Sequence, residues 1–527
     1  MNKDVQMLVS TIGTNKMWDA LQGFSEISHT LNLSATDIAH LIESFEEVKD
    51  MGALPEMRKA ISKWAEHNQD SAMSVFANLL KLDNAQLYSV APLIFKVLSA
   101  TPYRPKIFME VLALLNSISS SAMSAGIRAV SLVPSWNPEL KYDLKVLQAS
   151  EELFRQLIED VANHGLFADV SNCCFSLYPY FENPDQLLLK LAEFNDPQIQ
   201  YSIARGLWVS IKFEEHPTLC EALVLSLSSV DDSKKELISQ IDRTLHHLST
   251  VNVEVIIKYF NKWIQERALN EIFHIKEFSR TFEKVITLSN KAFETWITQS
   301  LLSKESKFHV AVAEVLSAIQ IPSGREIQFD GEIISKVNLE DIQYITFKTL
   351  GWINSKKYWR SLILSLLIQK IEDKKTLAFL SSIFQEPILY HYPSTKKYLQ
   401  SKQVLVSTSV AKALRSIIKK SDAYFEAIQK LERRQEFAPS EQRLLAYHKL
   451  EHKKFTEGIR KHQGDDHFMN TVKTIDLKGG KTWFCKINGT YTKKSELNTI
   501  EHSREMARSG VINPIGWARL QYEFRRG

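Results

Sequence analysis

The sequence has few of the residues that interrupt helices. Its 527 residues include only 17 glycines and 15 prolines. Proteins rich in β-turns use both residues freely, because tight turns need backbone angles that these two supply. Their scarcity disfavours a β protein and favours a helical one. One hydrophobic core rarely serves more than about 250–300 residues, so we expect several domains or an elongated stack of helices.

Cysteines and long apolar runs are also scarce. The four cysteines, Cys173, Cys174, Cys220 and Cys485, include no CxxC pair. We expect buried thiols in a reducing compartment. No window approaches the run of about 18 apolar residues that a membrane-spanning helix needs, and the first residues are too polar for a secretory signal. These absences predict a cytoplasmic protein with no membrane segment.

Signatures of common enzyme classes are missing as well. The sequence contains no P-loop, no GxGxxG and no GxSxG motif. These motifs place phosphates on backbone amides or expose a nucleophilic serine. We therefore expect no cofactor, and the sequence favours a protein that is not an enzyme.

Charge is unevenly distributed along the chain. The formal net charge is +4. Residues 396–527 hold 27 Lys and Arg against 14 Asp and Glu, whereas residues 1–395 hold 38 against 47. The C-terminal part therefore carries +13 and the rest −9. Such a division suggests that the C-terminal end meets an anionic partner, although a solvated basic surface would give the same counts.

Helical periodicity repeats from residue 15 to about 320, in segments of about 12–20 residues. Three breaks carry the same start signal, a capping side chain followed by proline: Asn137-Pro138, Asn183-Pro184 and Asp196-Pro197. The cap accepts from an unpaired amide, and proline fixes the first helical φ. The repetition predicts consecutive short helices.

The segment after Asp196 is the most informative of these. Its apolar positions form one helical face at Ile199, Ile203 and Leu207. The small residues Ala204 and Gly206 would let a neighbouring helix approach closely. This segment resembles the first helix of a HEAT repeat, and 307–319 and 121–133 have a similar pattern. The resemblance implies a HEAT/armadillo-like α-solenoid, over about half the chain and at the level of architecture.

Beyond residue 320 the pattern changes twice. Residues 321–335 contain breakers and predict a linker or small hairpin, followed by a second helical region over 336–462. One of its helices, expected over 405–420, places Val406, Val410, Ala413 and Ile417 on one face and Lys412, Arg415, Lys419 and Lys420 elsewhere. Amphipathic spacing of this kind predicts a helix with a basic outer surface.

The segment 463–527 predicts a small basic α/β cap on the helical stack. Residues 471–477 and 482–487 alternate as strands, and Asn488-Gly489 is a hairpin signal before a short third strand. Ser495 could cap a helix running to about Arg508. The fold class predicted from the sequence is therefore a mainly α-helical protein: a solenoid of HEAT-like helix pairs over residues 1–320, a second helical region, and a three-stranded meander with a helix.

Two patterns allow an enzymatic interpretation. His448, Glu451 and His452 match the HxxEH pattern of a zinc site, but the neighbouring lysines would repel a dication. Asp466, Asp476 and Lys478 faintly resemble a nuclease site, in which two acids hold Mg²⁺ and a lysine stabilises the developing phosphate charge. Such short patterns also arise by chance.

The binding interpretation depends on lysines interleaved with aromatics in the cap, because lysines neutralise phosphates and an exposed aromatic can stack on a base. The candidate nucleic-acid-binding residues are Lys473, Lys478, Lys481, Trp483, Lys486, Lys493, Lys494, Arg504 and Arg508. The aromatics could equally form the core of the cap. We favour a non-enzymatic scaffold that binds a protein partner through the solenoid and DNA or RNA through the C-terminal region. A pure protein–protein adaptor and a metal-dependent nuclease or hydrolase remain the alternatives.

Overall fold

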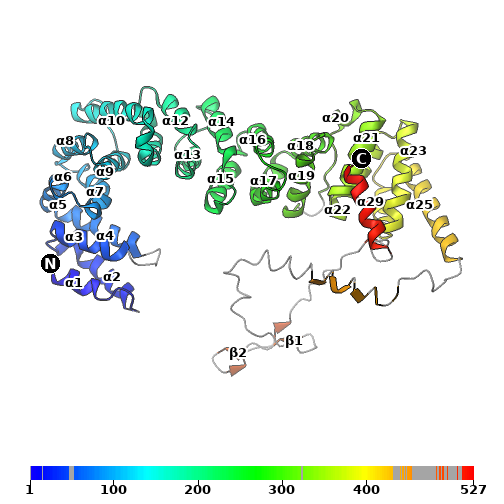
Figure 1. Cartoon of the computed structure of the whole chain (residues 1–527), viewed down its shortest axis with the longest axis horizontal. Coiled ribbons are helices and arrows are strands. Elements are labelled where there is room, and N and C mark those ends of the chain that lie inside the picture. The colour runs from blue at the N-terminus through cyan, green and yellow to red at the C-terminus, as the bar shows by residue number, and fades with distance from the viewer. Residues whose placement is uncertain are drawn as a thin grey trace. The chain divides into compact units, whose positions relative to one another are not determined.

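Figure 1 shows a computed structural model of the chain, which is built almost entirely from helices. The structure describes residues 2–14, 16–46, 53–321, 325–430, 440, 442–443, 445–446, 448–450, 452–453, 482–483, 486–487, 490–491, 495–496, 507 and 513–526. The chain forms two compact units. Unit 1 comprises residues 1–296 and 305–323, and unit 2 comprises residues 297–304 and 324–527.

Most of unit 1 is two rows of helices, in which every helix packs on the next helix of its own row (Figure 1). One row contains α7 (Ala85–Leu98), α9 (Ser120–Ser131), α11 (Phe167–Leu177), α13 (Pro197–Val209), α15 (Lys235–Leu248) and α17 (Ser279–Leu288). The other contains α8 (Arg104–Leu115), α10 (Lys141–Glu159), α12 (Pro184–Ala192), α14 (Pro217–Ser226), α16 (Val253–Glu266) and α19 (Ser306–Ala318). Alternation between two rows along the chain is the arrangement of a helical-repeat stack.

The remaining elements of unit 1 precede or link these rows. The N-terminal helices are α1 (Lys3–Val9), α2 (Met17–Ile27), α3 (Ala35–Glu46), α4 (Ala53–His67), α5 (Gln69–Ala77) and α6 (Leu79–Leu82). Short 3₁₀ segments connect helices at η1 (Ser28–Thr30), η2 (Val161–Leu166), η3 (Tyr178–Tyr180), η4 (Leu227–Ser229) and η5 (Ile272–Phe278). Helix α18 (Asn290–Leu302) is divided between the two units, with residues 290–296 in unit 1 and 297–302 in unit 2.

Buried hydrogen bonds join neighbouring helices of the first row at nearly regular sequence separations. Ser202 Oγ of α13 donates to Ser171 Oγ of α11 at 3.0 Å, 31 residues away. Thr244 Oγ1 of α15 donates to the Ala204 carbonyl of α13 at 2.8 Å, 40 residues away. Thr281 Oγ1 of α17 donates to Asp242 Oδ1 of α15 at 2.6 Å, 39 residues away. One helix pair of the stack therefore spans 31–40 residues, which is the sequence separation of these hydrogen-bond partners.

Helix α13 shows how the sequence produces this packing. Asp196 accepts hydrogen bonds from the Gln198 and Ile199 amides, as the Asp-Pro start predicts. The predicted apolar face is buried, because Ile199, Ile203 and Leu207 are each 1% exposed. A Cβ added at Gly206 would lie 2.3 Å from ring atoms of Phe175 in α11. Close approach between these two helices therefore requires the glycine.

The other two predicted start signals behave differently. Helix α12 begins at Pro184, but the Asn183 side chain makes no capping bond there. Asn137 precedes a turn, and α10 begins only at Lys141. The buried thiols of Cys173, Cys174 and Cys220 carry no disulfide, and Cys485 lies outside the described residues.

Unit 2 is also helical. Its elements are α20 (Gly331–Lys336), α21 (Leu339–Trp352), α22 (Lys356–Gln369), α23 (Lys374–Ile383), the π-helical turn η6 (Phe384–Leu389), α24 (Thr395–Lys402), α25 (Thr408–Gln429) and α29 (Pro514–Arg526). Helix α22 is buried along most of its length, with Leu362, Ile363, Leu366 and Leu367 each 0% exposed. Helices α20, α21 and α23 pack around it.

The predicted three-stranded cap is wrong. The described strands are two residues long: β1 (Thr482–Trp483), β2 (Lys486–Ile487), β3 (Thr490–Tyr491) and β4 (Ser495–Glu496). They form two separate antiparallel pairs, β1 with β4 and β2 with β3, and no three-stranded meander exists among the described residues. Pairs this short have no sheet face on which a core could form.

The helix predicted to start at Ser495 is also wrong at that residue, because Ser495 belongs to β4. The terminal helix is α29, which the sequence did not predict. Its Trp517 and Phe524 rings pack on His391 and Phe347 of unit 2, whereas Ile515 is 84% exposed. Alternating short-range patterns predicted the meander, whereas α29 is placed by long-range packing on α21.

Candidate nucleic-acid interface

Helix α25 is the longest helix that the structure describes in the basic C-terminal region. It begins at Thr408, three residues after the predicted start. Its buried residues are Val410, Ala411, Leu414, Ile417, Ile418 and Ser421. This face packs on α24 and η6. The predicted amphipathic helix is therefore present, but of the predicted apolar face Val406 precedes the helix and Ala413 is not among its buried residues. Its buried side holds it against the rest of unit 2.

Four cations occupy exposed positions on α25. Lys412, Arg415, Lys419 and Lys420 are all exposed; the first three are spaced by about one turn each, and Lys420 directly follows Lys419. Arg415 Nε donates to the Ala411 carbonyl of its own helix at 3.3 Å. None of the four forms an ion pair with a carboxylate in the described part of the chain. Their charge is therefore available to an external anion.

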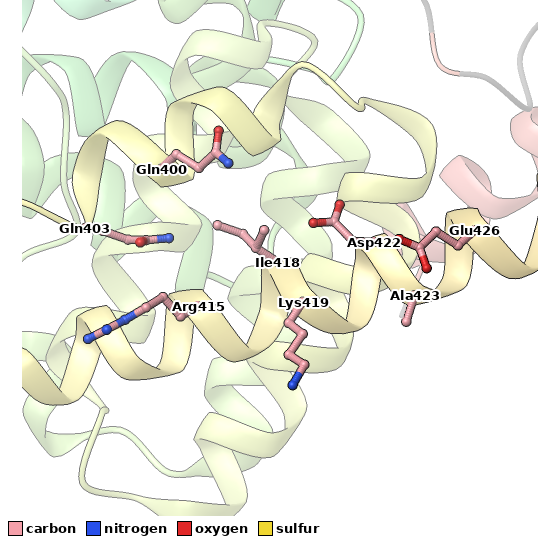
Figure 2. Close-up of a pocket in the computed structure, with 8 residues that line it drawn as sticks. All are labelled: Gln400, Gln403, Arg415, Ile418, Lys419, Asp422, Ala423 and Glu426. Carbon is pink, nitrogen blue, oxygen red and sulfur yellow. The ribbon is translucent and has the colours of Figure 1, made fainter.

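A groove of about 440 Å³ runs between α24 and α25 beside these cations (Figure 2). It is lined by Gln400, Gln403, Arg415, Ile418, Lys419, Asp422, Ala423 and Glu426. Figure 2 shows Arg415 and Lys419 on the stretch of α25 nearer Gln403, with Asp422 and Glu426 farther along the helix. Cations and amide donors therefore line one part of the groove, and carboxylates line the other.

Other cations of the same region are already paired. Lys396 Nζ donates to the two oxygens of Asp422 at 2.7 and 2.9 Å, which offsets the charge of that carboxylate. Lys402 Nζ lies 2.8 Å from Glu326 Oε2. The basic excess counted from the sequence is therefore partly neutralised within unit 2, and the row on α25 belongs to the part that no described carboxylate pairs.

Unit 1 contains a second cavity, of about 590 Å³, between the start of α12 and the start of α14. The Tyr178 hydroxyl donates to Asp185 Oδ1 at 2.6 Å and lies 2.9 Å from His216 Nδ1. Since the hydroxyl proton points to Asp185, the phenol oxygen accepts from the imidazole N–H. Burial of the phenol is the largest cause that raises the pKa of Tyr178, and the hydrogen bond to Asp185 and the charge of that carboxylate raise it further. The phenol therefore stays protonated and cannot act as a base at neutral pH.

Most of the predicted site residues lie outside the described residues: Lys473, Lys478, Lys481, Lys493, Lys494, Arg504, Arg508, Asp466 and Asp476. Trp483 lies in β1 and Lys486 in β2, in different strand pairs. The assignment of these residues to nucleic-acid binding or to catalysis therefore stays a prediction.

The predicted zinc pattern falls partly within the described residues. His448 and His452 are exposed there, and Glu451 is outside them. No group of three or more metal-ligating side chains that could hold an ion occurs among the residues described. Exposed histidines among lysines are typical of a solvated helical surface.

Sequence reasoning missed the two glutamines of the groove, Gln400 and Gln403. Gln400 lies in α24 and Gln403 directly follows its last residue, and both face α25 because the loop at 403–407 turns the chain back. Helical periodicity indicates the exposed side of one helix but not which neighbour borders it. The four cations of α25 were recognisable as a basic surface, although the predicted site was placed further along the chain.

Comparison with known proteins does not assign a family. No family model matches the chain, and no curated protein matches it. Among solved structures, the crystal structure of an engineered protein aligns with 80% of this chain and 99% of its own, at 14% identity and a TM-score of 0.21. At that score we draw nothing from the likeness. None of the described helices is long and apolar enough to cross a membrane.

Proposed function

We propose that the chain is a non-enzymatic scaffold of HEAT-like helix pairs in the cytoplasm, which binds DNA or RNA through its basic C-terminal region. Within the described residues, α25 is the contact surface. The observation that carries the proposal is the row of Lys412, Arg415, Lys419 and Lys420, exposed and not paired with any described carboxylate. Phosphate backbones are recognised mainly by such cations, and the binding is salt-dependent because counterions are released.

The groove beside this row supports the same proposal. Glutamine amides donate hydrogen bonds to phosphate and sugar oxygens, and Gln400 and Gln403 border the cations of α25. Asp422 is neutralised by Lys396, so it opposes a polyanion less than its charge suggests. Glu426 sets the limit of the favourable stretch, since it lines the same groove.

Unit 1 provides the surface for the proposed protein partner. Its cavity near α12 combines Tyr178 and Phe181 with the carboxylates of Glu182 and Asp185. Glu215 in the same lining is already ion-paired with Lys212 at 2.8 Å. Aromatic and acidic groups together suit a basic side chain of a partner protein. This agrees with the net negative charge of residues 1–395.

The test measures binding of labelled duplex and single-stranded DNA and RNA to the whole protein by fluorescence anisotropy, over a range of salt concentrations. The variant Lys412→Gln with Lys419→Gln removes two phosphate contacts. The logarithmic salt slope should therefore decrease by about 1.4–1.8. The control, Lys374→Gln with Lys375→Gln, removes the same charge from exposed positions of α23.

If both double variants lose nucleic-acid affinity equally, the effect arises from net charge alone. In that case α25 is not the contact surface. No binding at low salt to any of the four nucleic acids would overturn the nucleic-acid proposal. Binding by the variant Lys412→Gln with Lys419→Gln that equals wild-type binding at every salt concentration would also contradict it.

One observation favours the protein–protein adaptor as a second candidate. Val404 and Leu405, in the loop before α25, are 86% and 74% exposed. Apolar side chains gain from burial against a protein surface and not against phosphate. If Val404→Ser with Leu405→Ser abolishes capture of a protein partner while nucleic-acid binding is absent in the wild type, the adaptor is the better interpretation. The nuclease alternative requires Mg²⁺-dependent cutting that Asp476→Ala abolishes.

A further inference from the structure

Helix α29 is held on unit 2 by a small set of aromatic anchors. Figure 1 shows it, in red, beside α21, on which it packs. The Phe524 ring stacks on Phe347 of α21 with centroids 5.3 Å apart and an interplanar angle of 11°. The Trp517 ring contacts His391 edge-on at 4.6 Å. Residues seven apart lie two turns along one helical face, so both anchors point to the same side.

The last turn of α29 is bound by polar groups. Lys348 Nζ, on a residue only 3% exposed, donates to the Arg525 carbonyl at 2.5 Å. Arg525 Nε donates to the Gly351 carbonyl at 2.7 Å, and its guanidinium lies 4.9 Å from the Trp352 ring centroid. A cation at the carbonyl end of a helix is favourable, because that end carries partial negative charge. The last turns of α21 and α29 therefore each donate a side-chain hydrogen bond to a backbone carbonyl of the other.

Gly351 makes the close contact between α21 and α29 possible. A Cβ at this position would lie 3.0 Å from the Arg525 amide nitrogen and 3.0 Å from the Phe524 carbonyl carbon. Both are backbone atoms, which cannot rotate away as a flexible side chain could. Position 351 thus allows the backbone of a docked helix to approach.

The hold on α29 is shallow. None of its 13 residues is fully buried. A helix of this length is marginal in water by itself, so its helical form depends on the surface that receives it. These features are those of a helical peptide lying in a groove, where a few anchors spaced along one face provide the recognition.

We propose that the face formed by α21, α23 and residues 390–392 is a helix-docking groove, which α29 fills as an intramolecular ligand and from which a helix of a partner protein displaces it. The partner helix carries the same anchors, a tryptophan and a phenylalanine two turns apart followed by an arginine. The seated α29 shows what chemistry the groove accepts. Phe379 of α23 supports the Phe347 anchor site from behind, with its ring centroid 5.8 Å from that of Phe347. This inference does not depend on nucleic-acid binding.

The test uses the whole protein and a labelled synthetic peptide of residues 514–526 as the probe. Trp517→Ala with Phe524→Ala weakens the resident helix without removing charge, and it changes no fully buried residue. A tethered helix competes at an effective concentration of the order of 1 mM, so a peptide with a Kd of about 0.1 mM should bind this variant about tenfold more tightly than the wild type.

A second variant tests the groove itself. Gly351→Leu, added to the Trp517→Ala and Phe524→Ala background, should abolish peptide binding, because its side chain fills the space of the docked backbone. Hydrogen exchange of α22 amides reports whether the fold of unit 2 persists. The proposal is overturned if the peptide does not bind the variant Trp517→Ala with Phe524→Ala. It is also overturned if the peptide binds that variant equally with and without Gly351→Leu. Concentration-dependent dimers of the wild type that Trp517→Ala removes would overturn it in favour of a second copy as the occupant.

Discussion

Replacing Gly206 by alanine tests the packing of unit 1 directly, because two effects of opposite sign compete there. Gly206 lies inside α13, where a Gly→Ala change normally stabilises a helix by about 1 kcal/mol. However, the new Cβ would lie 2.3–2.4 Å from three ring atoms of Phe175. The ring is only 3% exposed, so it must displace its neighbours to move. Overpacking of this kind costs about 3 kcal/mol, and we expect a net loss of about 2 kcal/mol.

The assay is urea unfolding followed by far-UV circular dichroism, with hydrogen exchange to localise the change to α11 and α13. Gly23→Ala in α2 is the matched control, since its Cβ would meet no atom within 4 Å. That control should be neutral or stabilising. Phe175→Leu should recover part of the loss when combined with Gly206→Ala, as a double-mutant cycle would show. If Gly206→Ala is as stable as Gly23→Ala, the close approach of α11 and α13 is refuted.

Three further predictions concern buried polar groups. Arg267, 8% exposed, donates from Nε and Nη2 to Asp232 and from its terminal nitrogens to three carbonyls. Arg267→Lys should cost about 3 kcal/mol in a denaturant titration, because one ammonium cannot replace that fork. Thr281→Val removes the side-chain donor to Asp242; the loss should be about 1.5–3 kcal/mol, and a stable valine variant would contradict it. Burial lowers the pKa of His391 from 6.5 to about 4. The native state therefore binds fewer protons than the unfolded state in this range, and unit 2 should lose up to roughly 3 kcal/mol as pH falls from 6.5 to 4, a loss that His391→Gln should remove from thermal melts.

Local physical signals predicted the helical architecture well where they act within one helix. The Asp196 cap and the buried face of α13 follow from spacing and hydrogen-bonding groups that lie close in the sequence. The exposed cations of α25 follow from the same periodicity. Asn137 and Asn183 show the limit, because the same Asn-Pro pair can start a turn or a helix without a side-chain cap.

Features that depend on distant residues could not be predicted. Phe524 and Phe347 are far apart in the sequence, and nothing near either residue indicates the other. The segment after residue 463 was therefore interpreted from alternation alone, which produced the three-stranded cap. The groove beside α25 was missed for the same reason, since Gln403 and Arg415 become neighbours only after the loop between α24 and α25 turns.

The two rows of unit 1 have a mechanical consequence. Each helix makes its main contacts with the helices next to it along the stack, so a small rotation at one interface changes little elsewhere. Small rotations add up from one helix pair to the next. Unit 1 can therefore change its curvature and length elastically without losing its hydrophobic core. A partner that binds several helix pairs at once would fix the curvature of unit 1.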